Sequence, residues 1–277
     1  MLPSPDPESA YAPDQETAHA FLNPKVPNVA RIYDYLLGGK DHFAADREAA
    51  GQLIIAIPDV AIFARQNRDF LGRVVRFLSG SAGIRQFIDI GTGLPTQGSV
   101  HEVAHEADPS ARVVYVDHDP VVISHARALL ASHEPNVAAI GGDLRHPEQI
   151  LADPDLQALI SPGEPVAVLL IAVMHFLPDD DQPANITDTL MAALPPGSYL
   201  ALSHITAENI PAEANNKARA VYDSATARPY PRSHAELTRL FNTLDIIEPG
   251  VVDVAAWRAH PQAGRTLCYG GVARMPR

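Results

Sequence analysis

Three aspartates at the ends of three consecutive strand-like segments are the strongest chemical signal in the sequence. They are Asp89, Asp117 and Asp143. Because the carboxyl ends of parallel strands meet at one edge of a sheet, we expect the three carboxylates to lie close together. Asp117 follows Gly93 by 24 residues, a spacing at which a carboxylate can accept both hydroxyls of an adenosine ribose. The pattern predicts a nucleoside cofactor, and the alternative is three ordinary helix-capping aspartates.

A glycine turn follows the first of these segments and indicates which nucleoside cofactor binds. Gly91, Thr92 and Gly93 allow a sharp turn and a close approach to a ligand at the mouth of a helix. A dinucleotide fingerprint needs a third glycine or an alanine, where this chain has Thr96, preceded by Pro95. S-adenosylmethionine has no pyrophosphate, and its ammonium and sulfonium charges suit an acidic loop that starts at Asp89. The loop therefore favours S-adenosylmethionine over NAD.

Methyl transfer to an O–H or N–H acceptor needs exact positioning and is helped by a base. His175 and His204 follow the fourth and fifth strand-like segments, so both are candidate bases at the same sheet edge. Tyr33, Tyr222 and Tyr230 are further candidates for the wall of the site or for a base. The alternative for each histidine is a packed residue with a structural hydrogen bond.

The segment from Tyr33 to Phe43 is a candidate lid. A double glycine that ends in Gly39 is followed by Lys40, Asp41 and His42. Such a loop could fold over the cofactor, exclude water and orient the acceptor. We expect Gly39 and Lys40 to lie beside the cofactor, whereas the alternative is a helix terminator with a solvated charge pair.

One motif points to different chemistry. Residues 101–105 read H-E-x-x-H, which on a helix places two imidazoles on one face for zinc, with the glutamate as a base. The compact extension with a glycine and a third histidine does not follow, and Glu134 is a distant third ligand at best. A zinc hydrolase is therefore a remote alternative, and we expect no metal site. The single cysteine, Cys268, lies in an apolar strand pattern and is expected in the core.

The elements that position these residues follow a strand, loop and helix rhythm after Gly83. Apolar runs rich in β-branched residues predict strands that are buried on both faces, as in a parallel sheet covered by helices. Asp119-Pro120 and the capping box from Ser233 to Glu236 each open a helix. The last two apolar runs have no long helix between them and should pair antiparallel. The expected strands are 87–90, 113–116, 137–140, 166–172 and 199–202, followed by the runs 244–254 and 266–274.

The chain before the sheet divides into a tail and a helical part. Residues 1–27 are rich in proline and acids, so we expect a flexible tail. Three helices should follow, the first ended by a left-handed glycine cap at Gly38-Gly39. We therefore predict an N-terminal helical cap over 28–82 and a cofactor-binding domain over 83–277.

Charge and composition limit the possible partners. The formal net charge is −12, which disfavours nucleic acid or an anionic membrane as the main partner. The apolar runs are too short to span a membrane, and no export signal is recognised at the N-terminus. One cysteine fits a reducing compartment. We expect a cytoplasmic protein that acts on a small molecule, and the sequence predicts no oligomeric state.

The ordered segments FIDIGTG, VVYVDHDP, GGDL, PVAVLLIAVMHFLPD and LPPGSYLALSH resemble the motifs of class I S-adenosylmethionine-dependent methyltransferases. NVARIYDYLLGGKDHFAADREAA resembles a bacterial branch described as S-adenosyl methyltransferases. The resemblance implies a Rossmann-like α/β fold with a seven-stranded, mostly parallel sheet and a reversed C-terminal strand. Two alternatives stay open, a nicotinamide-dependent oxidoreductase and a non-catalytic S-adenosylmethionine-binding protein.

The same resemblance implies roles for individual residues. Gly91 and Gly93 form the turn beside the methionine part, with Thr92 between them, and Asp117 binds the ribose, followed by His118. Asp143 binds the adenine amino group and Leu144 lies beside the ring. Pro95 departs from the pattern, because many relatives have a third glycine there.

Overall fold

The computed structural model describes residues 23–95, 98–130, 134–259 and 267–276, and most of the predicted tail lies outside them. A central sheet has the strand order β3-β2-β1-β4-β5-β8-β6, with β7 also paired to β8. Strands β1 to β5 are parallel, and β8 runs antiparallel to β5, β6 and β7. The strands are β1 (Gln86–Ile90), β2 (Arg112–Asp117), β3 (Val137–Gly141), β4 (Ala167–Ile171), β5 (Tyr199–Ile205), β6 (Asp245–Ile246), β7 (Val252–Asp253) and β8 (Cys268–Arg274).

The predicted mixed sheet is confirmed, but its strand count was wrong. The run over 244–254 forms two strands of two residues each, β6 and β7, so the sheet has eight strands instead of seven. Glu248, Pro249 and Gly250 lie between them, and a proline lacks the N–H that a continuous ladder would need. Both short strands pair antiparallel with β8, as expected for this part of the chain.

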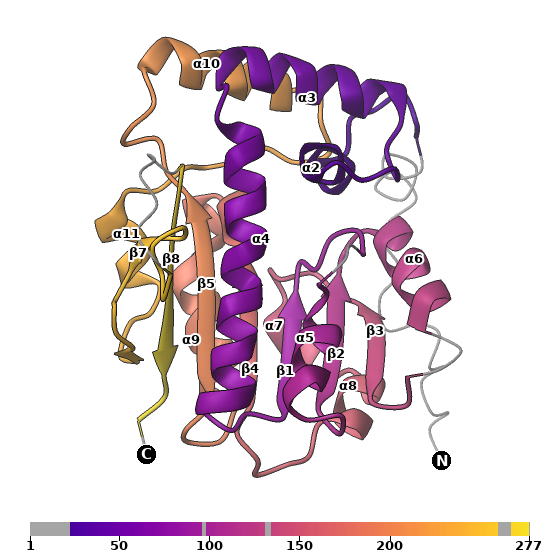
Figure 1. Cartoon of the computed structure of the whole chain (residues 1–277), viewed down its shortest axis with the longest axis vertical. Coiled ribbons are helices and arrows are strands. Elements are labelled where there is room, and N and C mark those ends of the chain that lie inside the picture. The colour runs from indigo at the N-terminus through magenta and orange to yellow at the C-terminus, as the bar shows by residue number, and fades with distance from the viewer. Residues whose placement is uncertain (1–22, 96–97, 131–133, 260–266, 277) are drawn as a thin grey trace.

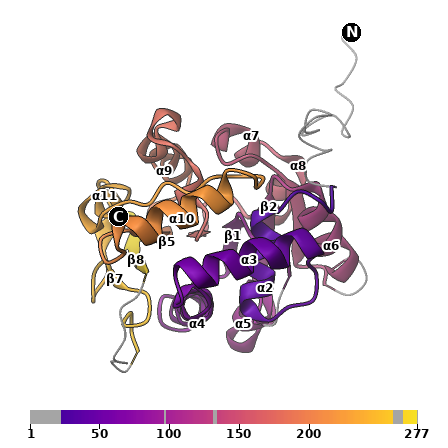
Figure 2. The same cartoon turned by 90° about the horizontal axis from the view of Figure 1, so that it is seen from above.

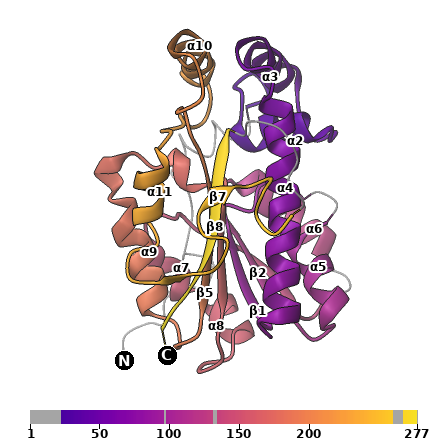
Figure 3. The ribbon, with the colours of Figure 1, turned by 60° about the vertical axis from the view of Figure 1, so that its left-hand side comes forward.

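Alternate side chains of the central strands pack on opposite faces. Phe87 belongs to one apolar cluster and Ile88 and Ile90 belong to the other. Figure 3 shows the sheet nearly edge-on, with α4, α5 and α6 on one face and α7, α8, α9 and α11 on the other. The bounds are α4 (Val60–Arg76), α5 (Val100–Ala107), α6 (Pro120–Leu130), α7 (Pro147–Leu151), α8 (Pro154–Leu159), α9 (Pro183–Ala192) and α11 (His234–Arg239). This burial on both faces explains why the strands are continuous apolar runs.

Three helices form a roof over the carboxyl ends of the parallel strands (Figures 1 and 2). They are α2 (Val29–Leu37), α3 (Ala44–Ala56) and α10 (Ala212–Tyr222). Helices α10 and α3 pack on each other, as do α2 and α3. The roof therefore combines the predicted N-terminal cap with a helix from the far end of the chain, whereas α4 runs down beside the sheet. The domain boundary at 82/83 stays a prediction.

Local signals in the sequence determine where the helices begin and end. The Asn28 side chain caps α2 by accepting from the N–H groups of Ala30 and Arg31, and Gly38 ends α2 with φ of +84°. Ser233 and Glu236 form the predicted capping box of α11. None of the helices in the described ranges is both long and apolar enough to cross a membrane.

Candidate functional site

A cavity lies between the roof and the carboxyl edge of the sheet, and it has two chemically different parts. The first part consists of polar groups at the ends of β1 and β2, which we call the strand-end site. The second part is mostly apolar, and we call it the acceptor chamber. The strand-end site comprises Asp89, Gly91, Thr92, Gly93, Asp117, His118 and Asp119. The acceptor chamber comprises Ile32, Tyr33, Leu36, Phe63, Asn67, Ile171, His175, Phe176, Ile205 and Tyr222.

The glycine turn of the strand-end site is tightly packed at one glycine and open at the other. Gly91 has φ of +73°, its N–H donates to Val116 O at 2.8 Å, and a Cβ atom there would collide with the Val173 side chain. Gly93 has φ of +66°, and a Cβ atom there would meet no atom within 4 Å. The chain therefore leaves space for a ligand beside Gly93, which fits the expected cofactor turn.

Asp117 holds the turn in place. Its carboxylate accepts from Gly93 N and from Asp119 N, both at 2.9 Å. Because a carboxylate offers about four lone-pair positions, it keeps acceptor capacity for a ligand hydroxyl beside these contacts. His118 Nδ1 lies 3.4 Å from Asp117 Oδ1. Burial lowers the pKa of His118, but the hydrogen bond to Asp117 and the surrounding negative charges outweigh burial and raise it overall.

Asp89 is buried at the end of β1, 5% exposed. Burial raises the pKa of Asp89 to about 6, the hydrogen bond with Thr92 and the charge of Arg68 lower it, and the charge of Asp117 raises it again. A desolvated carboxylate of this kind gains from a cationic ligand. The carboxylates of the strand-end site therefore fit the ammonium and sulfonium groups of S-adenosylmethionine better than the phosphates of a dinucleotide.

The structure separates two predicted cofactor residues from the cavity. Asp143 forms an ion pair with Arg145, and Leu144 is buried in the core beneath the sheet. Neither is among the described residues that line the cavity. The charge of Asp143 nevertheless contributes to the raised pKa of His118. The adenine-binding roles of Asp143 and Leu144 stay predictions.

Sequence reasoning missed the contact that joins the roof to the strand-end site. Asn28 Nδ2 donates to Asp119 Oδ2 at 2.7 Å, and Asn28 N donates to Asp46 Oδ1 at 2.8 Å. Arg31 Nε pairs with Asp46 Oδ2 at 2.8 Å, and both side chains are buried. Asn28 and Asp119 could be recognised from the sequence only as local helix caps, because nothing local connects positions 91 residues apart.

The loop predicted as a lid is folded around Asp34. A Cβ atom at Gly39 would collide with the Asp34 carboxylate, which accepts from Asp41 N at 2.9 Å and lies 3.0 Å from His42 Nδ1. Asp34 lines the cavity, whereas Gly39 and Lys40 are not among its described lining residues, and Lys40 is exposed. This geometry supports the helix-terminator alternative for Gly39 and Lys40 over direct cofactor contact.

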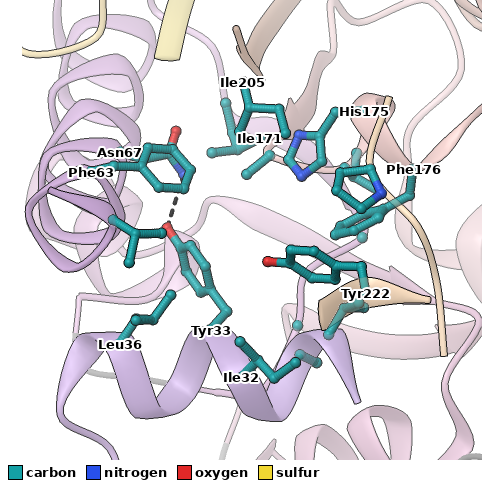
Figure 4. Close-up of a pocket in the computed structure, with 18 of the residues that line it drawn as sticks. Ile32, Tyr33, Leu36, Phe63, Asn67, Ile171, His175, Phe176, Ile205 and Tyr222 are labelled. Atoms are coloured by element: carbon teal, nitrogen blue, oxygen red, sulfur yellow. Dashed lines mark hydrogen bonds between the residues drawn. The ribbon is translucent and has the colours of Figure 1, made fainter. Parts of the chain in front are cut away.

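Tyr33 lines the acceptor chamber, but its hydroxyl is already used. It donates to Ala64 O at 3.0 Å and accepts from Asn67 Nδ2 at 3.0 Å (Figure 4). Burial raises the pKa of Tyr33 to about 12, against the opposing effect of the Asn67 hydrogen bond. The geometry disfavours Tyr33 as a base and makes it part of the wall.

The two candidate histidines have different surroundings. His175 lines the cavity and is 5% exposed, and its Nδ1 is buried without a hydrogen-bond partner among the described residues. Burial holds the pKa of His175 well below its usual range, so the ring is neutral at pH 7.

His204 lies behind this ring, with ring centroids 5.6 Å apart. Its Nε2 accepts from Arg232 Nη1 at 2.9 Å, and its Nδ1 lies 2.7 Å from Ile205 O, to which it donates. Burial lowers the pKa of His204 to about 4. His204 does not line the cavity and both ring nitrogens are occupied, which disfavours it as a base.

The H-E-x-x-H motif gains no support as a metal site. His101 Nδ1 lies 2.8 Å from the Tyr115 hydroxyl, and His105 Nε2 lies 2.9 Å from Ala111 O. Within the described ranges, no group of three histidine, cysteine or acidic side chains could hold a metal ion. The two histidines instead help to attach α5 to β2.

Comparisons with known proteins agree with this geometry. The family model described as S-adenosyl methyltransferase matches residues 15–276. A presumed methyltransferase from Thermobifida fusca YX is 39% identical, with a TM-score of 0.86, over 93% of this chain and 97% of that protein. A DUF574 family protein from Streptomyces avermitilis MA-4680 is 38% identical, with a TM-score of 0.87, over 94% of this chain and 100% of that protein. None of the curated proteins matches the sequence.

The family match supports a methyltransferase in place of the zinc hydrolase and the nicotinamide-dependent oxidoreductase. The protein is an S-adenosylmethionine-dependent methyltransferase whose acceptor is not specified by its relatives. By the match over nearly its whole length, the chain belongs to the S-adenosyl methyltransferase family.

Proposed function

We propose that the protein methylates a small molecule in the cytoplasm, with the cofactor in the strand-end site and the acceptor in the acceptor chamber. The observation that carries this proposal is that a single cavity includes both parts. In it, Asp117 would bind the ribose hydroxyls, and Gly91 to Gly93 would lie along the methionine part. Asp89 would face the cationic groups.

When bound, S-adenosylmethionine supplies the activated methyl group. The chain contributes position and exclusion of water, because α2, α3 and α10 cover the cavity and apolar side chains line most of it. Such positioning is a large part of the acceleration expected for a direct displacement.

His175 is the proposed proton acceptor. Because Nδ1 is shielded, Nε2 would be the ring nitrogen that meets a ligand, and in the tautomer with its hydrogen atom on Nδ1 the Nε2 lone pair would be available. The ring is neutral at pH 7, which is the state required of a base. The proton that the acceptor atom loses on methylation would pass to Nε2 and from there to water.

Calorimetric titration with S-adenosylmethionine, S-adenosylhomocysteine and NAD tests the cofactor site. We expect the first two to bind and NAD to bind weakly or not at all. Asp117→Ala should weaken cofactor binding by about 1 to 3 kcal/mol, because it removes a charged acceptor from the ribose. Asp108→Ala is the matched control, since Asp108 pairs with Arg85 away from the cavity. Selective NAD binding, or equal affinities for the two variants, would contradict the proposal.

A second measurement addresses the acceptor. Cell extract incubated with the protein and a limiting concentration of methyl-labelled S-adenosylmethionine should contain a labelled small molecule that is much less abundant with the Asp117→Ala variant. Label found only in macromolecules would reject the small-molecule acceptor while leaving the cofactor site intact.

A further inference from the structure

Charge is unequally distributed over the cavity. Its acidic lining residues are Asp89, Asp117 and Asp119 of the strand-end site and Asp34 of the roof. The Asp34 carboxylate is already used by Asp41 N and His42. The acceptor chamber contributes no carboxylate among the described lining residues. An ammonium group in the chamber would therefore be desolvated without a counter-charge, which is costly.

Four aromatic rings from four different elements surround the chamber (Figure 4). Tyr33 lies on α2, Phe63 on α4, Phe176 on the short 3-10 helix after β4, and Tyr222 on α10. Tyr33 and Phe63 already make an edge contact, with centroids 6.4 Å apart. Ring-lined walls with aliphatic side chains between them favour a planar aromatic ligand over a flexible polar one.

Two polar groups in the chamber have no hydrogen-bond partner among the described residues. Figure 4 shows the Tyr222 hydroxyl pointing into the middle of the cavity and the His175 ring at its border. No described residue forms a hydrogen bond with the Tyr222 hydroxyl, and burial raises the pKa of Tyr222 to about 12, so it stays protonated. One hydroxyl donor and one imidazole lone pair can together bind a ligand hydroxyl, which both accepts and donates.

A cation lies at the rim of the same chamber. Asn215, Arg219 and Tyr222 lie on one face of α10, four and three residues apart, and all three line the cavity. Arg219 is exposed and forms no ion pair with a described residue. It can therefore meet an anionic substituent on a ligand whose body lies in the chamber.

We propose that the acceptor is a hydroxylated aromatic molecule without positive charge. Its hydroxyl lies between Tyr222 and His175, its ring packs among the four aromatic side chains, and a carboxylate on its outer edge meets Arg219. This inference rests on the proposed function, because it describes the acceptor of the same site. A phenol-type hydroxyl also suits a weakly basic imidazole, since it loses its proton far more readily than an aliphatic alcohol.

Binding of three probes to the protein saturated with S-adenosylhomocysteine tests the inference without the natural acceptor. We expect 6-hydroxy-2-naphthoate, whose carboxylate lies at the opposite end of the ring system from its hydroxyl, to bind more tightly than 2-naphthol, and 2-naphthylmethylammonium to bind weakest, as measured by calorimetry or naphthol fluorescence. Equal or tighter binding of the ammonium probe would overturn the proposal.

Variants locate the contacts. Tyr222→Phe should weaken 2-naphthol binding two- to tenfold, the effect of one lost hydrogen bond. Arg219→Gln should weaken the binding of 6-hydroxy-2-naphthoate more than the binding of 2-naphthol. Tyr230→Phe is the control, because Tyr230 is exposed and outside the cavity lining, and it should bind all three probes like the wild type. If Tyr222→Phe behaves like Tyr230→Phe, the hydroxyl contact is wrong.

Cofactor binding in the same samples distinguishes a wrong acceptor class from a wrong cofactor site. If S-adenosylhomocysteine binds and neither naphthol binds, the acceptor class is wrong while the proposed cofactor site stands. If S-adenosylhomocysteine itself fails to bind to the folded protein, the proposed function fails, and the acceptor class fails with it.

Discussion

The two parts of the cavity are built in opposite ways. The strand-end site takes its groups from two adjacent strand ends, and backbone N–H groups and carboxylates connect them, as between Gly93 and Asp117. The acceptor chamber takes its side chains from the roof, α4 and the ends of β4 and β5, and they are mostly apolar. Local chain geometry therefore forms the cofactor half, whereas tertiary packing forms the acceptor half.

This difference explains why the cofactor was easier to predict than the acceptor. A glycine turn and a carboxylate at the next strand end are recognisable in short stretches of sequence, and they bind the cofactor in the same way whatever the acceptor is. The wall of the chamber can change one side chain at a time while the fold is kept. The comparison predicts that damage to the roof and damage to the turn have separable consequences.

The largest effect is expected at the buried ion pair that attaches α2 to α3. Arg31→Met leaves the Asp46 carboxylate buried without its guanidinium partner, and we expect a loss of about 3 to 5 kcal/mol in the free energy of unfolding. Urea denaturation measures this free energy for the wild type and the variant. Arg47→Met on α3 is the control, because Arg47 is exposed and its substitution should change stability little. A similar stability for the two variants would show that the roof does not depend on this pair.

A somewhat smaller loss of stability is expected from substitutions in the glycine turn of the strand-end site. Gly91→Ala forces a side chain into left-handed backbone and against Val173, which should cost about 2 to 4 kcal/mol in stability and abolish most cofactor binding. Gly93→Ala shares the backbone strain but has open space, so we expect about 1 kcal/mol of lost stability. Thermal denaturation compares the two variants, and equal losses would mean that the Val173 contact is unimportant.

The sheet could be predicted almost strand by strand, because runs that are apolar on both faces are typical of covered parallel strands. The expected strand at 87–90 is β1 with one more residue at its start. The division of 244–254 into two strands was missed, although Pro249 and Gly250 in the middle of this run are a turn signal. Helix α10 was missed as part of the roof because its sequence, AEANNKARAVY, has few apolar residues to form a stripe.

The candidate site was predicted where its groups are local and missed where they are not. Asp89, Gly91 and Asp117 do line one cavity, as the strand ends indicated. A sequence shows His175 and His204 as equivalent, since each follows a predicted strand, whereas the structure places His204 within β5. Only the structure shows that Arg232, 28 residues beyond His204, forms a hydrogen bond with His204, whereas His175 lines the cavity.

The smallest effect concerns the pH dependence of the strand-end site. Burial raises the pKa of Asp89 from 3.8 to about 6, so the folded state holds this proton more tightly than the unfolded state. Stability from this group is therefore greatest at low pH and falls as the pH rises through 3.8 to 6. Between pH 5 and 7 the free energy of unfolding should fall by about 1 kcal/mol more for the wild type than for Asp89→Asn, as measured by urea denaturation.

The exposed Asp155→Asn variant is the control, and its stability should change with pH as that of the wild type does. A cation bound beside Asp89 would lower its pKa again, so saturating S-adenosylmethionine should remove much of the difference. A loss that persists with the cofactor would mean that the cationic groups lie elsewhere in the cavity.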